Sequence, residues 1–161
     1  MMKLIFLSVL LLPLFGSGQK MAASVDVGLL KLKDVDNAFE ANIAIGGQFS
    51  KGGFLGGGLG VTKFKNTSIA IPTYFKMFIY NDKGKLSPLG NAQLGYMFVS
   101  RGNVNADITN GGFFGKIGFG MIGSGKTAPY ILANFTIADL TSKAGGDKGH
   151  TGFSFAAGIK F

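Results

Sequence analysis

Eight segments of this chain alternate between bulky apolar residues and small or polar ones with a period of two. Each is about ten residues long and is bounded by Gly, Asn, Asp, Lys or Ser. Such alternation is typical of β-strands with two different faces. Beyond its N-terminal apolar run, the chain is therefore predicted to be all-β. The segments cover residues 24–32, 39–49, 54–64, 69–79, 86–99, 112–122, 129–140 and 151–161.

Composition indicates which of the two faces points outward. Hydrophobic residues make up 47% of the chain and charged residues only 15%. The faces opposite the bulky residues are rich in glycine and poor in charge, as in segment 54–64, and cannot form the polar exterior of a soluble protein. A membrane barrel instead turns its bulky face to lipid and fills its lumen with small and polar side chains. We therefore expect the bulky faces to point outward.

The number of segments determines how such a sheet can close. Open sheet edges in lipid leave backbone N–H and C=O groups unpaired, at a cost of several kcal/mol each. Eight is the smallest usual number of strands in a closed membrane barrel. The predicted fold is an eight-stranded antiparallel up-and-down transmembrane β-barrel, in which the first strand pairs with the last.

The N-terminus has the layout of a cleavable secretory signal peptide. A positive start at Lys3 precedes an apolar run at 4–15 and the small residues Gly16, Ser17 and Gly18. The run is too short to cross a bilayer as a helix, which takes about 20 apolar residues. The expected organisation is a signal peptide at 1–18 and a barrel domain at 19–161, with Ala22 and Ala23 as alternative cleavage positions.

The last segment, 151–161, ends the chain on an aromatic residue. Its apolar face is made of Phe153, Phe155, Ala157, Ile159 and Phe161. This pattern resembles the closing strand of bacterial outer-membrane barrels, and the chain resembles small eight-stranded outer-membrane proteins of the OmpA/OmpX type, without a periplasmic domain. The resemblance implies an integral protein of the bacterial outer membrane. It also implies that these five residues form the assembly signal for the barrel-assembly machinery.

Connections and aromatic residues give further expectations about the two ends of the barrel. The longest predicted connections, 101–110 and 142–150, fall on the same side, which is the outer one if the N-terminus is periplasmic. Aromatic residues near strand ends suit the headgroup level of a membrane. The residues assigned there are Tyr74, Tyr80, Tyr96, Phe98, Tyr130 and Phe161.

Residues 120–127 read GMIGSGKT and match the phosphate-binding pattern G-x-x-x-x-G-K-T. That loop holds phosphates with backbone N–H groups at the start of a helix. Here Pro129 and a period of two follow, so no helix is expected. We predict a turn built by Gly123, Ser124 and Gly125, and no nucleotide partner.

His150 is the only histidine and lies near Asp147, Ser142 and Ser154 in the sequence. A lipid-processing hydrolase would need nucleophile, base and orienting acid within hydrogen-bond reach of one another. A solvated loop histidine is the favoured interpretation, so no catalytic residue is assigned. With one His and no Cys, no metal site and no cofactor are predicted, although Asp34 and Asp36 could bind calcium weakly.

Charged residues also occur on the faces that point into the predicted lumen. Such charges are expected to pair with one another. Because an eight-stranded lumen is just wide enough for side chains to fill it, the favoured interpretation is a structural polar network, with a narrow pore as the alternative. The charged members of the network are Asp26, Glu40, Lys76, Lys116 and Lys160.

Four lysines lie at those ends of the first and third predicted strands that point towards the outer leaflet, at positions whose side chains face lipid. They are Lys31, Lys33, Lys63 and Lys65. Lysine is costly in mid-bilayer and almost free at the interface. These side chains are candidates for contacts with phosphates of an anionic outer-leaflet lipid, lipopolysaccharide among them. Ordinary interfacial snorkelling is the alternative.

The sequence predicts a non-enzymatic outer-membrane barrel with a structural or surface-interaction role. Outer-membrane lipid and the assembly machinery are its expected partners. Despite a formal net charge of +8, nucleic acid is not expected, because Arg101 is the only arginine. The alternatives are a narrow passive pore, an outer-membrane lipid-modifying enzyme and a secreted lipocalin-like carrier with inverted faces.

Overall fold

The computed structural model describes residues 20–33, 35, 37–50, 52–65, 69–81, 84–100, 108–142 and 146–161. For residues 49, 50, 109, 142 and 146–148 it describes the backbone only. The predicted signal peptide at 1–18 and the calcium candidates Asp34 and Asp36 lie outside these residues. In the described part of the chain, no helix has the length and apolarity needed to span a bilayer.

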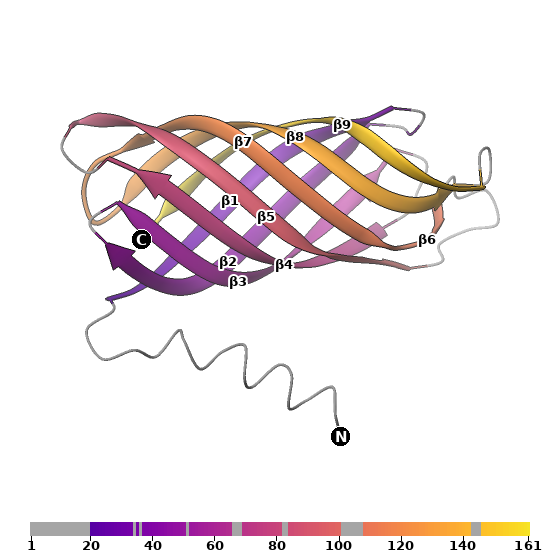
Figure 1. Cartoon of the computed structure of the whole chain (residues 1–161), viewed down its shortest axis with the longest axis horizontal. Coiled ribbons are helices and arrows are strands. Elements are labelled where there is room, and N and C mark those ends of the chain that lie inside the picture. The colour runs from indigo at the N-terminus through magenta and orange to yellow at the C-terminus, as the bar shows by residue number, and fades with distance from the viewer. Residues whose placement is uncertain are drawn as a thin grey trace, which may run out of the picture.

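In the part of the chain that the structure describes, eight long antiparallel strands close into a barrel (Figure 1). Each long strand pairs with its neighbours in the sequence, and the last pairs with the first, which confirms the predicted fold class. A short additional strand pairs with the rim of β8. The strands are β1 (Lys20–Leu32), β2 (Ala38–Ser50), β3 (Gly53–Phe64), β4 (Ile69–Tyr80), β5 (Leu86–Ser100), β6 (Ile108–Asn110), β7 (Phe113–Gly123), β8 (Ala128–Ser142) and β9 (Gly146–Lys160).

The barrel has two distinct ends. Phe161 and Ala23 exchange backbone hydrogen bonds of 2.8 and 3.3 Å, so β1 begins beside the end of the chain. We call this the terminal end and the opposite one the distal end. The alternative cleavage positions, Ala22 and Ala23, lie within β1.

At the distal end, one connection differs from the expectation. Residues 101–112 separate β5 from β7 and include β6. The predicted long connection at 142–150 is wrong, because residues 146–150 belong to β9 and Ser142 pairs directly with Gly146. This segment contains glycines and no apolar alternation, so the period that marks a strand is missing, while the backbone of β8 still supplies its pairing partners.

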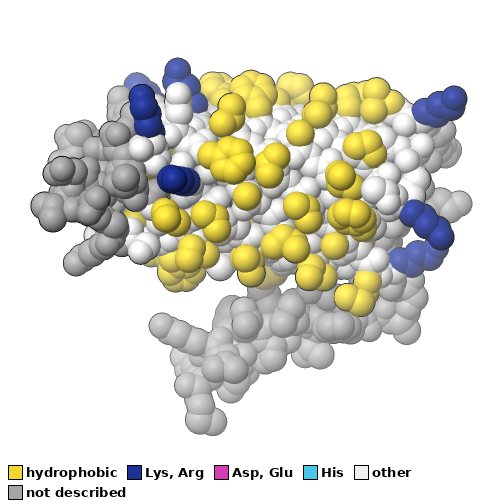
Figure 2. Space-filling model, turned by 180° about the vertical axis from the view of Figure 1, so that it is seen from behind, with side chains coloured by type: hydrophobic (Ala, Val, Ile, Leu, Met, Phe, Trp, Pro, Cys, Tyr) yellow, Lys and Arg dark blue, Asp and Glu magenta, His cyan; other side chains and the backbone are white. Residues whose placement is uncertain are grey.

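The bulky faces point outward, as predicted. Large hydrophobic residues are exposed on every long strand, and Phe119 reaches 76% exposure and Phe113 68%. Figure 2 shows these side chains spread over the face in view between the two ends of the barrel, with Lys side chains near both ends. A soluble carrier would have its bulky side chains inside, which is the opposite arrangement.

Candidate functional site

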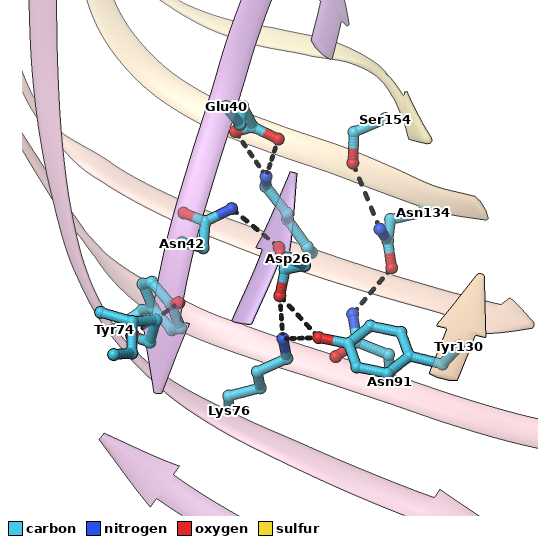
Figure 3. A network of polar contacts seen from close by, with 11 residues as sticks. Asp26, Glu40, Asn42, Tyr74, Lys76, Asn91, Tyr130, Asn134 and Ser154 are labelled. Atoms are coloured by element: carbon cyan, nitrogen blue, oxygen red, sulfur yellow. Dashed lines mark hydrogen bonds and ion pairs between the residues drawn. The ribbon is translucent and has the colours of Figure 1, made fainter. Parts of the chain in front are cut away.

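Two ion pairs cross the lumen of the barrel (Figure 3). Lys76 of β4 pairs with Asp26 of β1 at 2.5 Å. Lys116 of β7 donates to both carboxylate oxygens of Glu40 of β2, at 2.6 and 2.7 Å. All four side chains are buried and alternate along their strands with outward apolar residues. The lumen therefore holds two balanced pairs of opposite charges.

Asp26 is the centre of a larger network. Its Oδ1 accepts a hydrogen bond from Asn42 Nδ2 at 3.0 Å, and its Oδ2 accepts one from the Tyr130 hydroxyl at 2.8 Å. Lys76 has no exposed surface, donates to the Tyr130 hydroxyl at 3.1 Å and lies 4.5 Å above the ring of Phe78. A buried charge is tolerated when it is paired and hydrogen-bonded. This network supplies both conditions for Lys76 and Asp26.

A neutral chain of hydrogen bonds lies beside the ion pairs. Asn91 of β5 donates to Asn134 Oδ1 of β8 at 2.7 Å, and Asn134 donates to Ser154 Oγ of β9 at 3.2 Å. Together with the ion pairs, these bonds connect β1, β2, β4, β5, β7, β8 and β9 through the lumen.

Lys160, the fifth charged residue assigned to the lumen, lies apart from these two ion pairs. It is buried at the terminal end, 5.7 Å from the centre of the Tyr80 ring. It borders a cavity of about 900 Å³ whose lining includes Lys20 and Lys126.

Large apolar residues lie in the lumen towards both ends, where the sequence predicts small and polar side chains. At the distal ends of their strands, Leu30, Phe64 and Phe114 are buried. Towards the terminal end, Phe54 and Phe78 have no exposed surface and their ring centres lie 5.8 Å apart. The polar network is thus placed between two apolar layers.

Tyr74 and Tyr130 are lumen residues, so their predicted place at the headgroup level is wrong. Both are buried, and the Tyr74 hydroxyl donates to the Ile43 carbonyl oxygen at 3.2 Å. Their positions have the inward parity of β4 and β8, which a tyrosine can occupy when its hydroxyl finds a partner inside.

The GMIGSGKT motif lies across the end of β7, a turn and the start of β8. Gly120 pairs with Leu132, and Gly125 adopts a φ of 111°. Over residues 108–142 the chain has no helix whose N-terminus could hold a phosphate. The motif is a turn, as predicted, and Gly125 is its left-handed residue.

His150 is in β9 and is buried, whereas a solvated loop position was predicted. Its Nδ1 lies 3.1 Å from the Lys33 carbonyl oxygen and its Nε2 3.1 Å from that of Leu140. Ser154 is four residues further along the same strand, a backbone separation of about 13 Å. The ring thus faces main-chain oxygens of both neighbouring segments. The described residues contain no group of three or more His, Cys, Asp or Glu that could hold a metal ion.

The four outward lysines gather at the distal ends of β1 and β3. Lys31, Lys33, Lys63 and Lys65 are all exposed. Lys63 pairs with Phe39 of β2, and Lys65 N–H donates to the Asn37 carbonyl oxygen at 3.2 Å. The distal end of β2 therefore lies between the two pairs of lysines.

The residues of the predicted assembly signal share the outer face at the closing edge. Phe153, Phe155, Ala157 and Ile159 are exposed on β9, and Phe161 follows at the terminal end with 54% exposure. In the pairing of β9 with β1, Phe155 lies opposite Leu29 and Ile159 lies opposite Val25. The signal residues thus lie along the seam where the barrel closes.

A closed eight-stranded barrel with an apolar exterior and a polar layer inside its lumen defines the class of small outer-membrane barrels. The chain matches the crystal structure of Neisserial surface protein A with a TM-score of 0.70 and 11% identity, over 89% of this chain and 98% of that one. It matches the outer membrane enzyme PagL with a TM-score of 0.57 and 14% identity, over 84% and 97% of the two chains.

A third structure has the same architecture. The N-terminal β-barrel domain of Pseudomonas aeruginosa OprF matches with a TM-score of 0.56 and 11% identity, over 89% of this chain and 99% of that domain. No protein-family model matches this chain, and no curated protein sequence matches it. At these identities the three structures show a shared fold.

Proposed function

We propose that this chain is an integral barrel of the bacterial outer membrane with a structural or surface-interaction role and no catalytic activity. The observation that carries the proposal is the outer surface, where large apolar side chains are exposed on every long strand. Exposed apolar area on this scale is unfavourable in water and favourable in lipid. The fold shared with three outer-membrane barrels supports the same location.

The lumen supports a structural role rather than passage of solutes. Ion pairs join β1 to β4 and β2 to β7 at its centre. Buried apolar residues such as Leu30 and Phe54 lie on either side of the polar layer. We therefore assign the polar network to stabilising the barrel.

The surroundings of His150 support the absence of catalysis. A general base must reach the hydroxyl or water that it activates, yet both ring nitrogens face backbone carbonyl oxygens at 3.1 Å. PagL is described as an outer membrane enzyme, and its likeness to this chain is one of fold.

Two kinds of partner follow from the proposed location. The lysines at 31, 33, 63 and 65 would contact lipid phosphates, with lipopolysaccharide as the candidate lipid of the outer leaflet. The outward residues of β9 and Phe161 would be recognised by the barrel-assembly machinery before the seam with β1 forms.

Fractionation of cells that produce the chain tests the proposed location. Outer membranes are separated from inner membranes and soluble fractions, and then washed with urea and with carbonate. We expect the protein to stay in the washed outer membrane and to need detergent for release. Recovery in the soluble periplasmic or extracellular fraction would contradict the proposal and favour a carrier.

A further inference from the structure

A groove of about 750 Å³ crosses the outer, lipid-facing surface of the barrel. It extends from β2 and β1 over β9 and β8 to β7, and its side chains are apolar. Its central residues are Ala133 and Ala157, and its walls include Phe39, Phe119 and Phe155.

The groove exists because two neighbouring outward positions carry small side chains. Ala133 of β8 pairs with Phe119 on one side and Phe155 on the other. Ala157 of β9 pairs with Ile131 and with Val27. Two alanines among larger neighbours leave a depression in the apolar band, with the shape that a flexible hydrocarbon chain can fill.

The groove reaches the outward lysines at its distal end. Leu29 and Phe39 line it and pair with each other, and Phe39 also pairs with Lys63. Lys31 lies two residues beyond Leu29 on the same face, about 7 Å further along the strand. The apolar groove and the basic group are therefore continuous.

The backbones of the four lysines lie close together at the distal end. Leu30 pairs with Ala38, so the next residue of β1, Lys31, lies beside Asn37. On the other side of Asn37, the backbone N–H of Lys65 donates to the Asn37 carbonyl oxygen. Two strand spacings separate the backbones of Lys31 and Lys65, about 10 Å. In the described part of the chain none of the four lysines is in an ion pair, and the outward positions of β1 to β4 carry no acidic residue. This surface is suited to more than one phosphate group.

We propose that the groove and the four lysines form one binding site for a lipid that carries two phosphates and several acyl chains. The lysines bind the phosphates at the headgroup level, and one acyl chain occupies the groove over Ala133 and Ala157. The site rests on the proposed function, because the groove faces lipid only in an inserted barrel.

Charge favours this occupant over a second copy of the chain. In a membrane, a two-fold axis between identical barrels runs along the bilayer normal, so an isologous contact over β1 would place the lysines of both copies at the same height. Like charges facing each other oppose that contact. A lipid with two phosphates has the complementary charge.

Native mass spectrometry of the purified barrel in detergent micelles, titrated with lipid A carrying two phosphates, tests the site. A combined Lys31→Gln, Lys33→Gln, Lys63→Gln and Lys65→Gln variant removes the charges, and a combined Ala133→Phe and Ala157→Phe variant fills the groove. The matched controls are Lys85→Gln with Lys126→Gln, at the terminal end, and Ala92→Phe, on the outer face of β5. We expect each test variant to weaken binding about tenfold or more and the controls to leave it unchanged.

A second lipid and two checks of folding complete the experiment. Phosphatidylglycerol, with a single phosphate, should bind the wild-type barrel more weakly than lipid A and should respond less to loss of the lysines. Equal binding of the two lipids, or an effect of only one test variant, would overturn the single site. Each variant is also checked for a boiling-dependent gel shift and for membrane fractionation. A barrel that passes both checks without selective binding overturns this site alone, whereas a wild-type chain that fails them overturns the proposed function.

Discussion

Lys116 of β7 donates two hydrogen bonds to Glu40 of β2 across the full width of the barrel, at 2.6 and 2.7 Å. The strand order places four steps between β2 and β7 in either direction around the barrel. The pair therefore joins opposite walls, and both side chains are buried. A chain without cysteine has here a non-covalent cross-link through its lumen.

Removing one member of this pair should destabilise the barrel more than removing both. Glu40→Leu leaves the Lys116 ammonium buried without its carboxylate, and we expect a loss of about 3–5 kcal/mol in the free energy of unfolding. The double variant Glu40→Leu with Lys116→Met should lose clearly less. Urea unfolding in detergent micelles, followed by circular dichroism, measures both, with Lys85→Met as an exposed control. A double variant that lost as much stability as Glu40→Leu alone, or more, would contradict the pairing.

The network around Asp26 should show a graded response. Tyr130→Phe removes the hydrogen bond that the hydroxyl donates to Asp26 and the one that it accepts from Lys76. It leaves the ion pair between Lys76 and Asp26 in place, so we expect a loss of about 1.5–3 kcal/mol. Asp26→Leu also deprives the fully buried Lys76 of its counter-ion, so its loss should be larger, about 3–5 kcal/mol. The same unfolding assay ranks the two variants. Equal losses from the two variants would show that the Asp26 carboxylate contributes no more to stability than the Tyr130 hydroxyl, contrary to what their contacts imply.

Neighbouring glycines in β3 should respond differently to alanine. A Cβ at Gly58 would lie 2.6 Å from the Tyr74 ring and from the Ile43 carbonyl oxygen, whereas one at Gly57 would have no neighbour within 4 Å. Gly58→Ala should therefore cost about 1–3 kcal/mol through overpacking, and Gly57→Ala should change stability by less than about 0.5 kcal/mol. Equal stability of the two variants would mean that Tyr74 does not pack against Gly58.

The purified barrel should not conduct ions. Apolar side chains lie on both sides of the polar layer, and Lys76, Phe54 and Phe78 have no exposed surface. We expect no steady unitary steps in planar bilayers, and an insertion control is needed, such as recovery of the protein from the bilayer-forming vesicles. Reproducible steps with a single conductance would instead favour the narrow pore.

Phe161→Ala should impair assembly more than stability. Phe161 is largely exposed, and its backbone, not its ring, makes the two hydrogen bonds to Ala23. We expect less protein in the outer membrane and more in the periplasm, while material refolded in detergent unfolds at nearly the wild-type urea concentration. Phe113→Ala, an exposed phenylalanine in β7, is the matched control. Normal insertion of Phe161→Ala would remove the recognition role and leave only the strand.

The alternation of residues was sufficient to predict the strands and their outward faces, because parity depends only on local sequence. Val25, Val27 and Leu29 are exposed and Asp26 is buried, as the period requires. The same rule places Tyr74 inside, although tyrosine in general prefers membrane interfaces. Parity also places Phe54 and Leu30 inside, yet their side chains are larger than the small and polar ones expected in the lumen.

The specific pairs in the lumen could not be predicted in the same way. Lys76 and Asp26 are 50 residues apart, and Lys116 and Glu40 are 76 apart. Which inward side chains meet depends on the stagger of all eight strands around the closed barrel, and no local pattern specifies it. The sequence does not predict the pairing of residues 146–150 with β8 for a related reason. These residues lack the alternation of a strand, and their strand conformation is visible only from their pairing with β8.

If the chain folds as a closed barrel in a membrane, its electrophoretic mobility should change on boiling. Protein extracted from outer membranes in mild detergent is run on a gel in dodecyl sulfate, with and without prior boiling. A barrel closed by the β1–β9 pairing and held by buried ion pairs should stay folded until boiled and give two different apparent masses. A single band at the same apparent mass in both lanes would show that the chain does not form a closed barrel.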